Sequence, residues 1–514
     1  MPNTFIDTSL ALSAAYLLYY VLKWYRLRGL MPPGPIGLPW IGNKHQLPSV
    51  KPWKTFAQWS NQYGPVSSIL LGSTPVIILG KAQPAWDLLE KRSDIYSSRP
   101  RFVVAGEILS NNMRGLLLPN NNGTWKRWRK VLHTGFQSRQ ATAYQDIQSL
   151  ESKLMLKQIL DEPSLFEKHL QRYAASVAVS VTYGKRVNSI DEWIVKENME
   201  AVDYLVNVNI PGKYIVESWP WLLKLPRFMQ WFRREPEERR QRDIKFLTYL
   251  LSDVQERMNA GTVQECLSSK FLAQIDQLGM SKLELAYAVS SPFGAGIETT
   301  AATLASFVLA MLHFPLVMKK AHAELDSIIG QDRMPDFEDR ENLPYINALI
   351  NETLRWRPVA ILGGMPHAVT VDDVYNGMFI PKGSTVFANF YGIMRDPEMF
   401  PDPETFKPER FIETEDPRLK QFDLPFGFGR RSCPGIHLAR NSVFINVARM
   451  LWAFDILPAL DKNGNEIIPD SNNYTNGFNS RPVTFDCRFL PRSEKILACV
   501  DSEWQMATSR LSQW

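Results

Sequence analysis

The chain has 514 residues, of which 45% are hydrophobic and 22% charged, a composition typical of a globular protein. Its 58 basic and 53 acidic residues leave a formal net charge of +5, too even a balance for charge-driven binding of nucleic acid. The four cysteines lie far apart in the sequence, so they indicate neither a disulfide framework nor a zinc knuckle. We therefore expect a globular protein of a reducing compartment that has no nucleic-acid partner.

An uncharged apolar run occupies residues 10–22, and Trp24 and Tyr25 follow it. It is shorter than the roughly 20 residues that usually span a bilayer, but it suits a thin one. Asp7 precedes the run and basic residues follow it, which does not fit a cleaved signal peptide. Residues 1–28 are thus predicted to be a single-pass anchor with the remaining chain in the cytosol. The alternative is a buried amino-terminal helix.

Prolines and glycines dominate the next segment, where the sequence MPPGPIGLP stands at 31–39. Such a composition favours a stiff, extended spacer, which we place at residues 29–40. No repeat, low-complexity tract or second linker of this kind follows. Residues 41–514 are therefore predicted to form one domain.

The apolar patterns along this domain are mostly helical. A strand pair is predicted at Val66–Leu71 and Thr74–Leu79, and a second hairpin at residues 369–375 and 378–387 around Asn376-Gly377. The pattern from 125 to 310 is mainly helical. The predicted fold class is therefore mainly α, an α+β domain in which small sheets accompany a large helical body.

One predicted helix is unusually long. It begins with a capping box from Ser281 to Glu284, and its apolar pattern continues to Phe314. Pro292 and the two glycines after it weaken the backbone hydrogen bonds, so we expect the helix to open just before Glu298. An acid and a hydroxyl directly after that opening suggest a functional site.

The stretch FGFGRRSCPG at 426–435 places one cysteine, Cys433, between glycines and arginines. The glycines permit close backbone approach, and Arg431 could meet an anionic group. Pro434 suits the first turn of a helix predicted at residues 436–452. Positive charge, a bound metal and a helix amino terminus all lower the pKa of a thiol. From these residues alone, Cys433 could be a structural thiol, a reactive thiol or a metal-binding thiolate.

Five residues of this stretch match the pattern F-x-x-G-x-R-x-C-x-G: Phe426, Gly429, Arg431, Cys433 and Gly435. This pattern resembles the haem-binding loop of the cytochrome P450 family. Three further stretches resemble motifs of the same family in the same order: Ala295 to Thr300 (AGIETT), Glu352 to Arg355 (ETLR) and Pro408 to Phe411 (PERF). The resemblance extends from the anchor to about residue 490, and it is strongest to fungal microsomal members that make secondary metabolites.

The resemblance implies roles for these residues. Haem would be the cofactor, and the Cys433 thiolate would be the axial ligand of its iron, with Phe426, Arg431, Gly435 and Ala295 as neighbours. In the family the threonine matched by Thr299 steadies dioxygen by hydrogen bonds, and the acid matched by Glu298 supplies protons through water. Glu352, Arg355 and Arg410 would form a buried charge network behind the cysteine loop; taken alone, Glu352 and Arg355 would be an ordinary surface pair.

Further haem contacts are implied at the propionates. Trp125 and Arg129 lie four residues apart on a predicted helix, and the family places such a pair on a propionate. An arginine packed over an aromatic ring is the alternative. His367 matches a position where the family often has a histidine or arginine on a propionate, although a lone histidine is otherwise usually a surface residue.

Aligned with the family, the substrate pocket would be apolar, which favours a lipophilic small molecule; most of the aligned residues could equally be plain core. They are Phe102, Val103, Val104, Phe293, Val359, Ile361, Leu362 and Phe478.

The activity implied is that of a monooxygenase, which inserts one atom of O2 into its substrate and reduces the other to water. No dinucleotide-binding motif follows a strand, so electrons from NADPH would arrive through cytochrome P450 reductase at the endoplasmic reticulum membrane. Lys126, Arg127 and Lys130 offer a basic docking patch, or simply a solvated face. The alternatives are a hydroperoxide isomerase or peroxygenase, and a non-catalytic haem protein that binds a gas or carries electrons.

A second membrane contact is predicted within residues 219–234, which mix aromatic and basic side chains. A core helix hairpin is the alternative. The residues concerned are Trp219, Trp221, Trp231, Phe232, Lys224, Arg227, Arg233 and Arg234.

Overall fold

The computed structural model describes residues 24–210 and 212–512 and, before these, residues 12, 15, 16, 18, 19, 21 and 22. The predicted anchor, residues 1–28, therefore lies largely outside the described residues. Contacts divide the chain into two compact units. Unit 1 comprises Met1–Pro100, Met365–Ile393 and Phe428–Arg431, and unit 2 comprises Arg101–Gly364, Met394–Gly427 and Ser432–Trp514.

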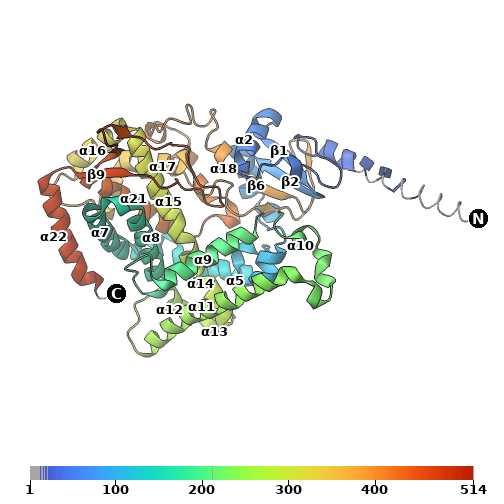
Figure 1. Ribbon diagram of the computed structural model, residues 1–514, viewed down its shortest axis with the longest axis horizontal. Coiled ribbons are helices and arrows are strands. Elements are labelled where there is room, and N and C mark those ends of the chain that lie inside the picture. The colour runs from blue at the N-terminus through green and yellow to red at the C-terminus, as the bar shows by residue number, and fades with distance from the viewer. Residues whose placement is uncertain are drawn as a thin grey trace, which may run out of the picture. The chain divides into compact units, whose positions relative to one another are not determined.

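Unit 1 is built on a four-stranded sheet with the order β1-β2-β6-β3. Strands β1 (Val66–Leu71) and β2 (Thr74–Leu79) form the predicted hairpin, which turns at Gly72 with φ at +62°. Strand β6 (Thr385–Ala388) is parallel to β2, and β3 (His367–Ala368) is antiparallel to β6. Helix α2 (Pro52–Tyr63) packs on this sheet (Figure 1).

The second predicted hairpin is shorter than expected. It consists of β4 (Asp373–Tyr375) and β5 (Met378–Ile380). The prediction extended it to residue 387, but residues 385–388 belong to the other sheet. Pro381 has no amide N–H with which to continue the ladder, and Gly383, with φ at +81°, turns the chain away.

The segment predicted as a spacer packs along β1. The amide of Ser68 donates to the carbonyl of Pro33 at 2.9 Å, and the side-chain amide of Asn43 donates to the carbonyl of Pro35 at 3.0 Å. The Arg28 guanidinium donates to the carbonyl of Pro32 at 2.8 Å. The prolines thus hold their extended conformation against the sheet.

Unit 2 is mostly helical and contains a small sheet with the order β8-β7-β9: β8 Glu466–Ile467, β7 Phe454–Leu460 and β9 Cys487–Pro491. Helix α15 packs along α8, and α7 packs on α8, α21 and α22 (Figure 1). This architecture confirms the mainly helical α+β class. The longer helices are α5 Gly123–Phe136, α7 Gln145–Asp161, α8 Phe166–Tyr183, α9 Trp193–Val208, α11 Arg234–Asn259, α14 Lys282–Val289, α15 Ser291–His313, α16 Pro315–Ile328, α17 Pro344–Trp356, α21 Ile436–Ala453 and α22 Glu494–Leu511.

The predicted long helix is divided into α14 and α15. Ser281 caps α14 by accepting from the amide of Glu284 at 3.1 Å, but the Glu284 carboxylate accepts from Arg127 at 2.6 Å and does not complete a capping box. The break falls at Ser290 and not, as predicted, just before Glu298. Pro292 lacks the N–H that would continue α14 and lies in the first turn of α15, which begins at Ser291.

Among the described residues, one helical stretch, Lys282–His313, is long and apolar enough to cross a membrane. Its most apolar window is 72% buried within the protein. The stretch is therefore a core helix of unit 2 by its packing.

Candidate active site

The cysteine loop approaches α21 in a tight turn. In unit 2, the amide of Cys433 donates to the carbonyl of Phe426 at 2.8 Å, and Gly427 has φ at +83°, a conformation that favours glycine. Gly435 is the N-cap of α21, which begins at Ile436. Pro434 was predicted to lie in the first turn of this helix, but it stands just before the helix begins.

Burial raises the pKa of the Cys433 thiol, while the backbone N–H of Gly435 and the charge of Arg129 oppose that rise. We expected positive charge, a helix amino terminus and a bound metal together to lower this pKa, and of these the charge of Arg129 does oppose the rise. A coordinating metal ion removes the thiol proton, and the N–H group and the guanidinium then favour the thiolate.

Helix α5 carries the predicted pair Trp125 and Arg129. Asn122 caps this helix by accepting from the amide of Trp125 at 3.2 Å, and Trp125 is buried. Arg129 donates to the carbonyl of Ser432 at 2.8 Å, next to Cys433. Burial lowers the pKa of Arg129, an effect that the charge of Cys433 opposes.

Of the predicted basic docking patch on α5, Lys126 and Lys130 are exposed. Arg127 is partly exposed, and its guanidinium binds the carboxylate of Glu284.

In unit 1, residues 428–431 pack against the segment before α4 (Ser93–Tyr96). Gly429 has φ at +51°, and a Cβ there would lie 2.7 Å from the carbonyl oxygen of Leu89, so only glycine fits. Arg431 donates through Nε to the carbonyl of Ser97 at 2.7 Å.

Unit 1 also gathers buried basic side chains. His367 on β3 shares a 2.9 Å hydrogen bond between Nδ1 and the carbonyl of Tyr96. Burial, with the charges of Arg99 and Arg431, lowers the pKa of His367 to about 3, so the ring is neutral at neutral pH. Arg99 was missed by sequence reasoning; it is buried and donates to the carbonyl of Met365 at 2.7 Å.

Helix α15 is buried along most of its length, but Ala295 is exposed and Thr299, one turn later, is partly exposed. The Thr299 hydroxyl donates to the carbonyl of Ala295 at 2.7 Å. Thr300 is buried. Phe293 also points away from this face: it is fully buried, and its ring packs edge to face on Tyr183 at 6.1 Å. The structure thus brings Ala295 and Thr299 together but does not bring Phe293 to them.

Glu298 has a partner that the sequence did not indicate. The side-chain amide of Asn479 donates to its carboxylate at 2.7 Å. Asn479 follows Phe478, a predicted pocket residue, in an irregular segment without a recognisable pattern. This hydrogen bond fixes the orientation of the acid.

The structure brings Glu352, Arg355 and Arg410 together. Arg355 forms two hydrogen bonds with Glu352, at 2.7 and 2.8 Å, and Arg410 lies 3.2 Å from the same carboxylate. Glu352 and Arg355 are fully buried. Arg355 also donates to the carbonyl of Met394, and Glu352 accepts from the amide of Lys407, both at 2.8 Å.

The other predicted pocket residues lie in unit 2. Val103 and Val104 are buried in a π-helical turn, η3 (Val103–Leu109), and their amides donate to the Glu217 carboxylate at 3.1 and 2.7 Å. Glu217, a further missed residue, thereby fixes that turn; burial raises its pKa, while the two amides oppose the rise. Phe102 is the N-cap residue of this turn. The carbonyl of Val359 accepts a hydrogen bond from the amide of Ser480. The remaining predicted pocket residues are Ile361, Leu362 and Phe478.

The donor set fits a haem. A haem iron takes its axial ligands from the protein, and a single thiolate with basic groups beside it is one such arrangement. Cys433 is placed in this way, with Arg129 and the backbone N–H of Gly435 next to its sulfur. Within residues 24–210 and 212–512, no three histidine, cysteine or acidic side chains are grouped as a metal cluster would require.

Known proteins with similar sequences include fungal monooxygenases. Cytochrome P450 monooxygenase 58 of Postia placenta is 38% identical over 495 residues, 95% of this chain and 94% of that relative. Cytochrome P450 monooxygenase fogE of Aspergillus ruber is 36% identical, over 92% of this chain and 89% of fogE. Cytochrome P450 monooxygenase claR of Ampulloclitocybe clavipes is 36% identical, over 96% of this chain and 92% of claR.

The fold is also that of a solved structure. A zebrafish cytochrome P450 with progesterone has a TM-score of 0.72 and 24% identity, and the match covers 86% of this chain and all of that one. The family profile for cytochrome P450 matches residues 32–479. With these matches and with the geometry around Cys433, the chain belongs to the cytochrome P450 family and is a haem-dependent monooxygenase.

Proposed function

We propose that this monooxygenase oxidises a lipophilic small molecule of fungal secondary metabolism, with electrons from NADPH supplied by cytochrome P450 reductase. The observation that carries this proposal is the accessible strip on α15. That helix is apolar and buried, yet it keeps Ala295 and the Thr299 hydroxyl exposed in part, as a wall of a reaction cavity would. When bound, haem supplies oxygen activation, and a thiolate ligand favours cleavage of the O–O bond.

The side chains of the protein then have separate tasks. Cys433 would hold the iron, and Thr299 would donate a hydrogen bond to dioxygen after leaving the carbonyl of Ala295. Glu298, oriented by Asn479, would pass protons from water toward Thr299. The Glu352 network would keep the loops of unit 2 in place, because its arginines also bind backbone carbonyls.

We also propose that Arg129 and Trp125, and in unit 1 Arg431 and His367, bind haem propionates, with Arg99 as an additional donor. The Arg129 guanidinium binds Ser432 through both terminal nitrogens and keeps further N–H groups for a propionate. His367 is different: if its Nδ1–H donates to Tyr96, its Nε2 can donate only when the ring is protonated. A carboxylate nearby would favour that protonation.

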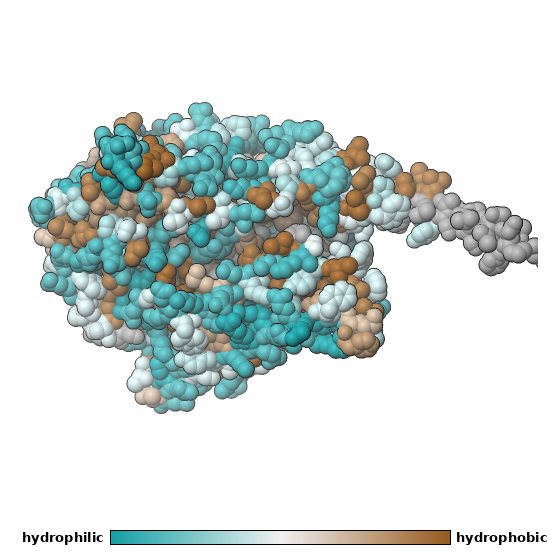
Figure 2. Space-filling model, in the orientation of Figure 1, coloured by the Kyte–Doolittle hydropathy of each residue, from teal (hydrophilic) through white to brown (hydrophobic). Residues whose placement is uncertain are grey.

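Residues 1–28 are proposed to anchor the protein in the endoplasmic reticulum membrane, ahead of the packed segment 29–40 and the domain from 41 onward. A second contact is supported by residues 219–234, where short helical turns expose large apolar side chains such as Phe228, at 87%, and Trp231, at 66%. Figure 2 shows apolar surface around α10 (Ile215–Ser218). Phe232, predicted to take part, is buried.

Three arms of one experiment separate this function from its alternatives. Membranes that contain the protein and the reductase are given NADPH and an extract of fungal metabolites, hydrogen peroxide and the extract, or NADPH without the extract. We expect extract-dependent consumption of NADPH and O2 with a new oxygenated product in the first arm. Product formed equally well with peroxide indicates a peroxygenase, and no turnover in any arm indicates a binding protein. Metabolites lost on gene deletion identify the pathway.

A further inference from the structure

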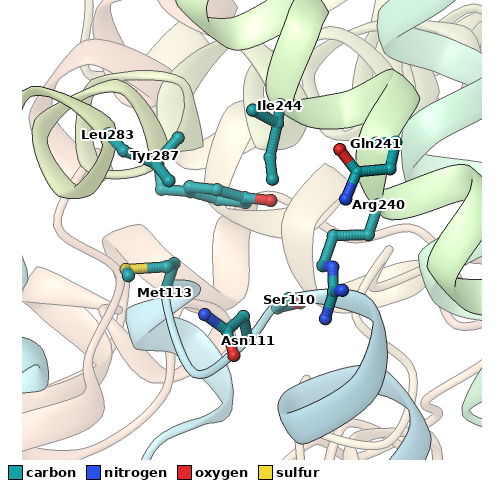
Figure 3. A pocket seen from close by; sticks show the side chains of 8 residues that line it. All are labelled: Ser110, Asn111, Met113, Arg240, Gln241, Ile244, Leu283 and Tyr287. Atoms are coloured by element: carbon teal, nitrogen blue, oxygen red, sulfur yellow. The ribbon is translucent and has the colours of Figure 1, made fainter.

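A cavity of about 260 Å³ lies in unit 2 at a place that none of the proposed catalytic residues lines (Figure 3). Its floor is the turn that follows η3, where Asn111 and Asn112 take left-handed conformations with φ at +45° and +57°. Its other walls come from α11 and α14. A volume of this size accommodates a small organic molecule.

The lining has an apolar part and a polar part. Met113, Ile244 and Leu283 supply aliphatic surface, and the side chains of Arg240 and Gln241 enter from α11 (Figure 3). Tyr287 lies across the cavity, with its hydroxyl on the side of these two residues. Such a lining suits a molecule with an apolar body and one strongly polar end.

The Tyr287 hydroxyl needs a partner. Tyr287 is 2% exposed, and its hydroxyl forms no hydrogen bond with the part of the chain that the structure describes. A buried hydroxyl without a partner is unfavourable, and a ligand that accepts a hydrogen bond from it would remove that penalty. Burial raises the pKa of Tyr287, although the charge of Arg114 opposes the rise, so the hydroxyl remains a donor at neutral pH.

The charge on this wall is positive. Arg240 donates to the carbonyl of Ile108 at 3.0 Å and forms no ion pair within residues 24–210 and 212–512. The nearby carboxylate, Asp243, is already shared by Arg114, at 3.0 Å, and Arg239, at 2.7 Å. Arg240 therefore brings an uncompensated cation to the cavity, with N–H groups left over for a ligand.

We propose that this cavity binds a small organic carboxylate, which accepts hydrogen bonds from Arg240 and the Tyr287 hydroxyl and rests its apolar body on Ile244 and Leu283. A carboxylate is the anion that a guanidinium and a phenol recognise together through charge-assisted hydrogen bonds. The small volume, about 260 Å³, favours a compact ring over a long chain. The site does not depend on the identity of the oxidised substrate.

The test uses 4-fluorophenylacetate as the probe and fluorine NMR of the probe with the full-length haem protein in nanodiscs. The haem is first saturated with 4-phenylimidazole, so that binding near the iron is blocked. Arg240→Gln should weaken probe binding at least tenfold, and Tyr287→Phe about threefold, because the charge contributes more than the neutral donor. Lys245→Gln removes a charge from the same helix outside the cavity and should leave binding unchanged.

A second probe isolates the charge. The uncharged amide, 4-fluorophenylacetamide, should bind at least tenfold more weakly than the acid to the wild-type protein. Equal binding of acid and amide would overturn the proposal, and so would unchanged binding of the acid by Arg240→Gln. Loss of all probe binding on saturation with 4-phenylimidazole would assign the probe to the haem pocket and would equally overturn it. Unchanged haem absorbance of each variant verifies its fold.

Discussion

Two buried networks in unit 2 have the same composition and different positions. In one, Glu352 is held by Arg355 and Arg410; in the other, Glu151 is held by Arg172 and Arg186. Both glutamates are fully buried. The Glu352 network also binds the backbone of the irregular segment between α18 (Phe390–Ile393) and α19 (Glu409–Ile412), at Met394 and Lys407.

The Glu151 network connects helices. Glu151 lies on α7 and Arg172 on α8, while Arg186 follows α8 and also contacts the carbonyl of Leu511 on α22. The hydroxyl of Ser176 on α8 donates to Glu151 at 2.8 Å. Its contacts therefore secure the packing of the helical body, whereas those of Glu352 secure irregular backbone.

The comparison shows that burial and charge pairing do not by themselves identify a functional network. Both networks would be costly to break, because the loss of one partner leaves a buried charge uncompensated. The two networks differ in the property that is lost when each is broken. We expect loss of the Glu352 network to remove haem binding, and loss of the Glu151 network to lower stability alone.

The largest effect is expected for Glu352→Gln, which leaves Arg355 and Arg410 buried beside a neutral amide. The cost of breaking such a network is about 3–5 kcal/mol. Because the segment that this network holds leads toward the cysteine loop, haem per folded protein should fall below one tenth of the wild-type value. Haem absorbance relative to protein in the monomeric fraction measures it. A soluble variant with full haem content would show that the network is not required for haem binding.

Glu151→Gln should lower the free energy of unfolding by a similar amount, about 3–5 kcal/mol. The protein that remains folded should nevertheless keep its full haem content, since no irregular loop depends on this network. Denaturant titration and haem content are the two measurements. Glu238→Gln, which removes an exposed pair with Arg234, is the matched control and should change stability by less than about 1 kcal/mol. A haem-free but folded Glu151→Gln protein would contradict the distinction.

Thr299→Ala should change neither stability nor haem content, yet it should lower product per NADPH by roughly tenfold to a thousandfold, the usual cost of losing one positioned donor. Without the Thr299 hydroxyl, NADPH should still be consumed, but the reduced oxygen should be released as hydrogen peroxide. Thr300→Ala, on the buried face of the same helix, is the control and should keep its coupling. The assay compares product, peroxide and NADPH for the three proteins; unchanged coupling in Thr299→Ala would remove Thr299 from the proton path.

The smallest expected effect is on the free energy of unfolding at acidic pH. Burial alone would raise the pKa of Glu151, but Arg172 and Arg186 outweigh it and hold the pKa below its usual value of 4.5. A carboxyl whose pKa is lowered by folding contributes stability above the unfolded pKa and loses it as pH falls through the folded one. The stability gap between wild type and Glu151→Gln should therefore be constant above about pH 4.5 and shrink below it. Urea titrations at pH 7, 5 and 4 measure that gap, and a constant gap would contradict the lowered pKa.

The sequence was most informative where a short stretch specifies its own geometry. The hairpin at Val66–Leu71 and Thr74–Leu79 and the helix that begins at Ile436 both depend on neighbouring residues, and the structure places them where they were predicted. An interruption caused by Pro292 was predicted, but its position was wrong. A proline interrupts a helix on its amino-terminal side, and the glycines that follow Pro292 remain helical.

What the sequence did not indicate depends on distant partners. Arg99 and Asn479 acquire their positions from residues more than 150 places away along the chain. The Glu151 network joins residues 21 and 35 positions apart without any motif. The effect of burial, which raises the pKa of Cys433, was not indicated by the residues beside it in the sequence. Such effects arise from tertiary packing, which local patterns do not encode.

The central claim is that Cys433 supplies the thiolate ligand of haem iron, and the carbon monoxide spectrum of the reduced protein tests it most directly. Thiolate ligation should give the red-shifted Soret band that distinguishes it from histidine ligation. Cys433→Ser should lose this band. Cys266→Ser, in which the new hydroxyl can still cap α12 (Leu267–Leu272), should retain it. A red-shifted band in folded Cys433→Ser protein, or a histidine-type band in the wild type, would contradict the assignment.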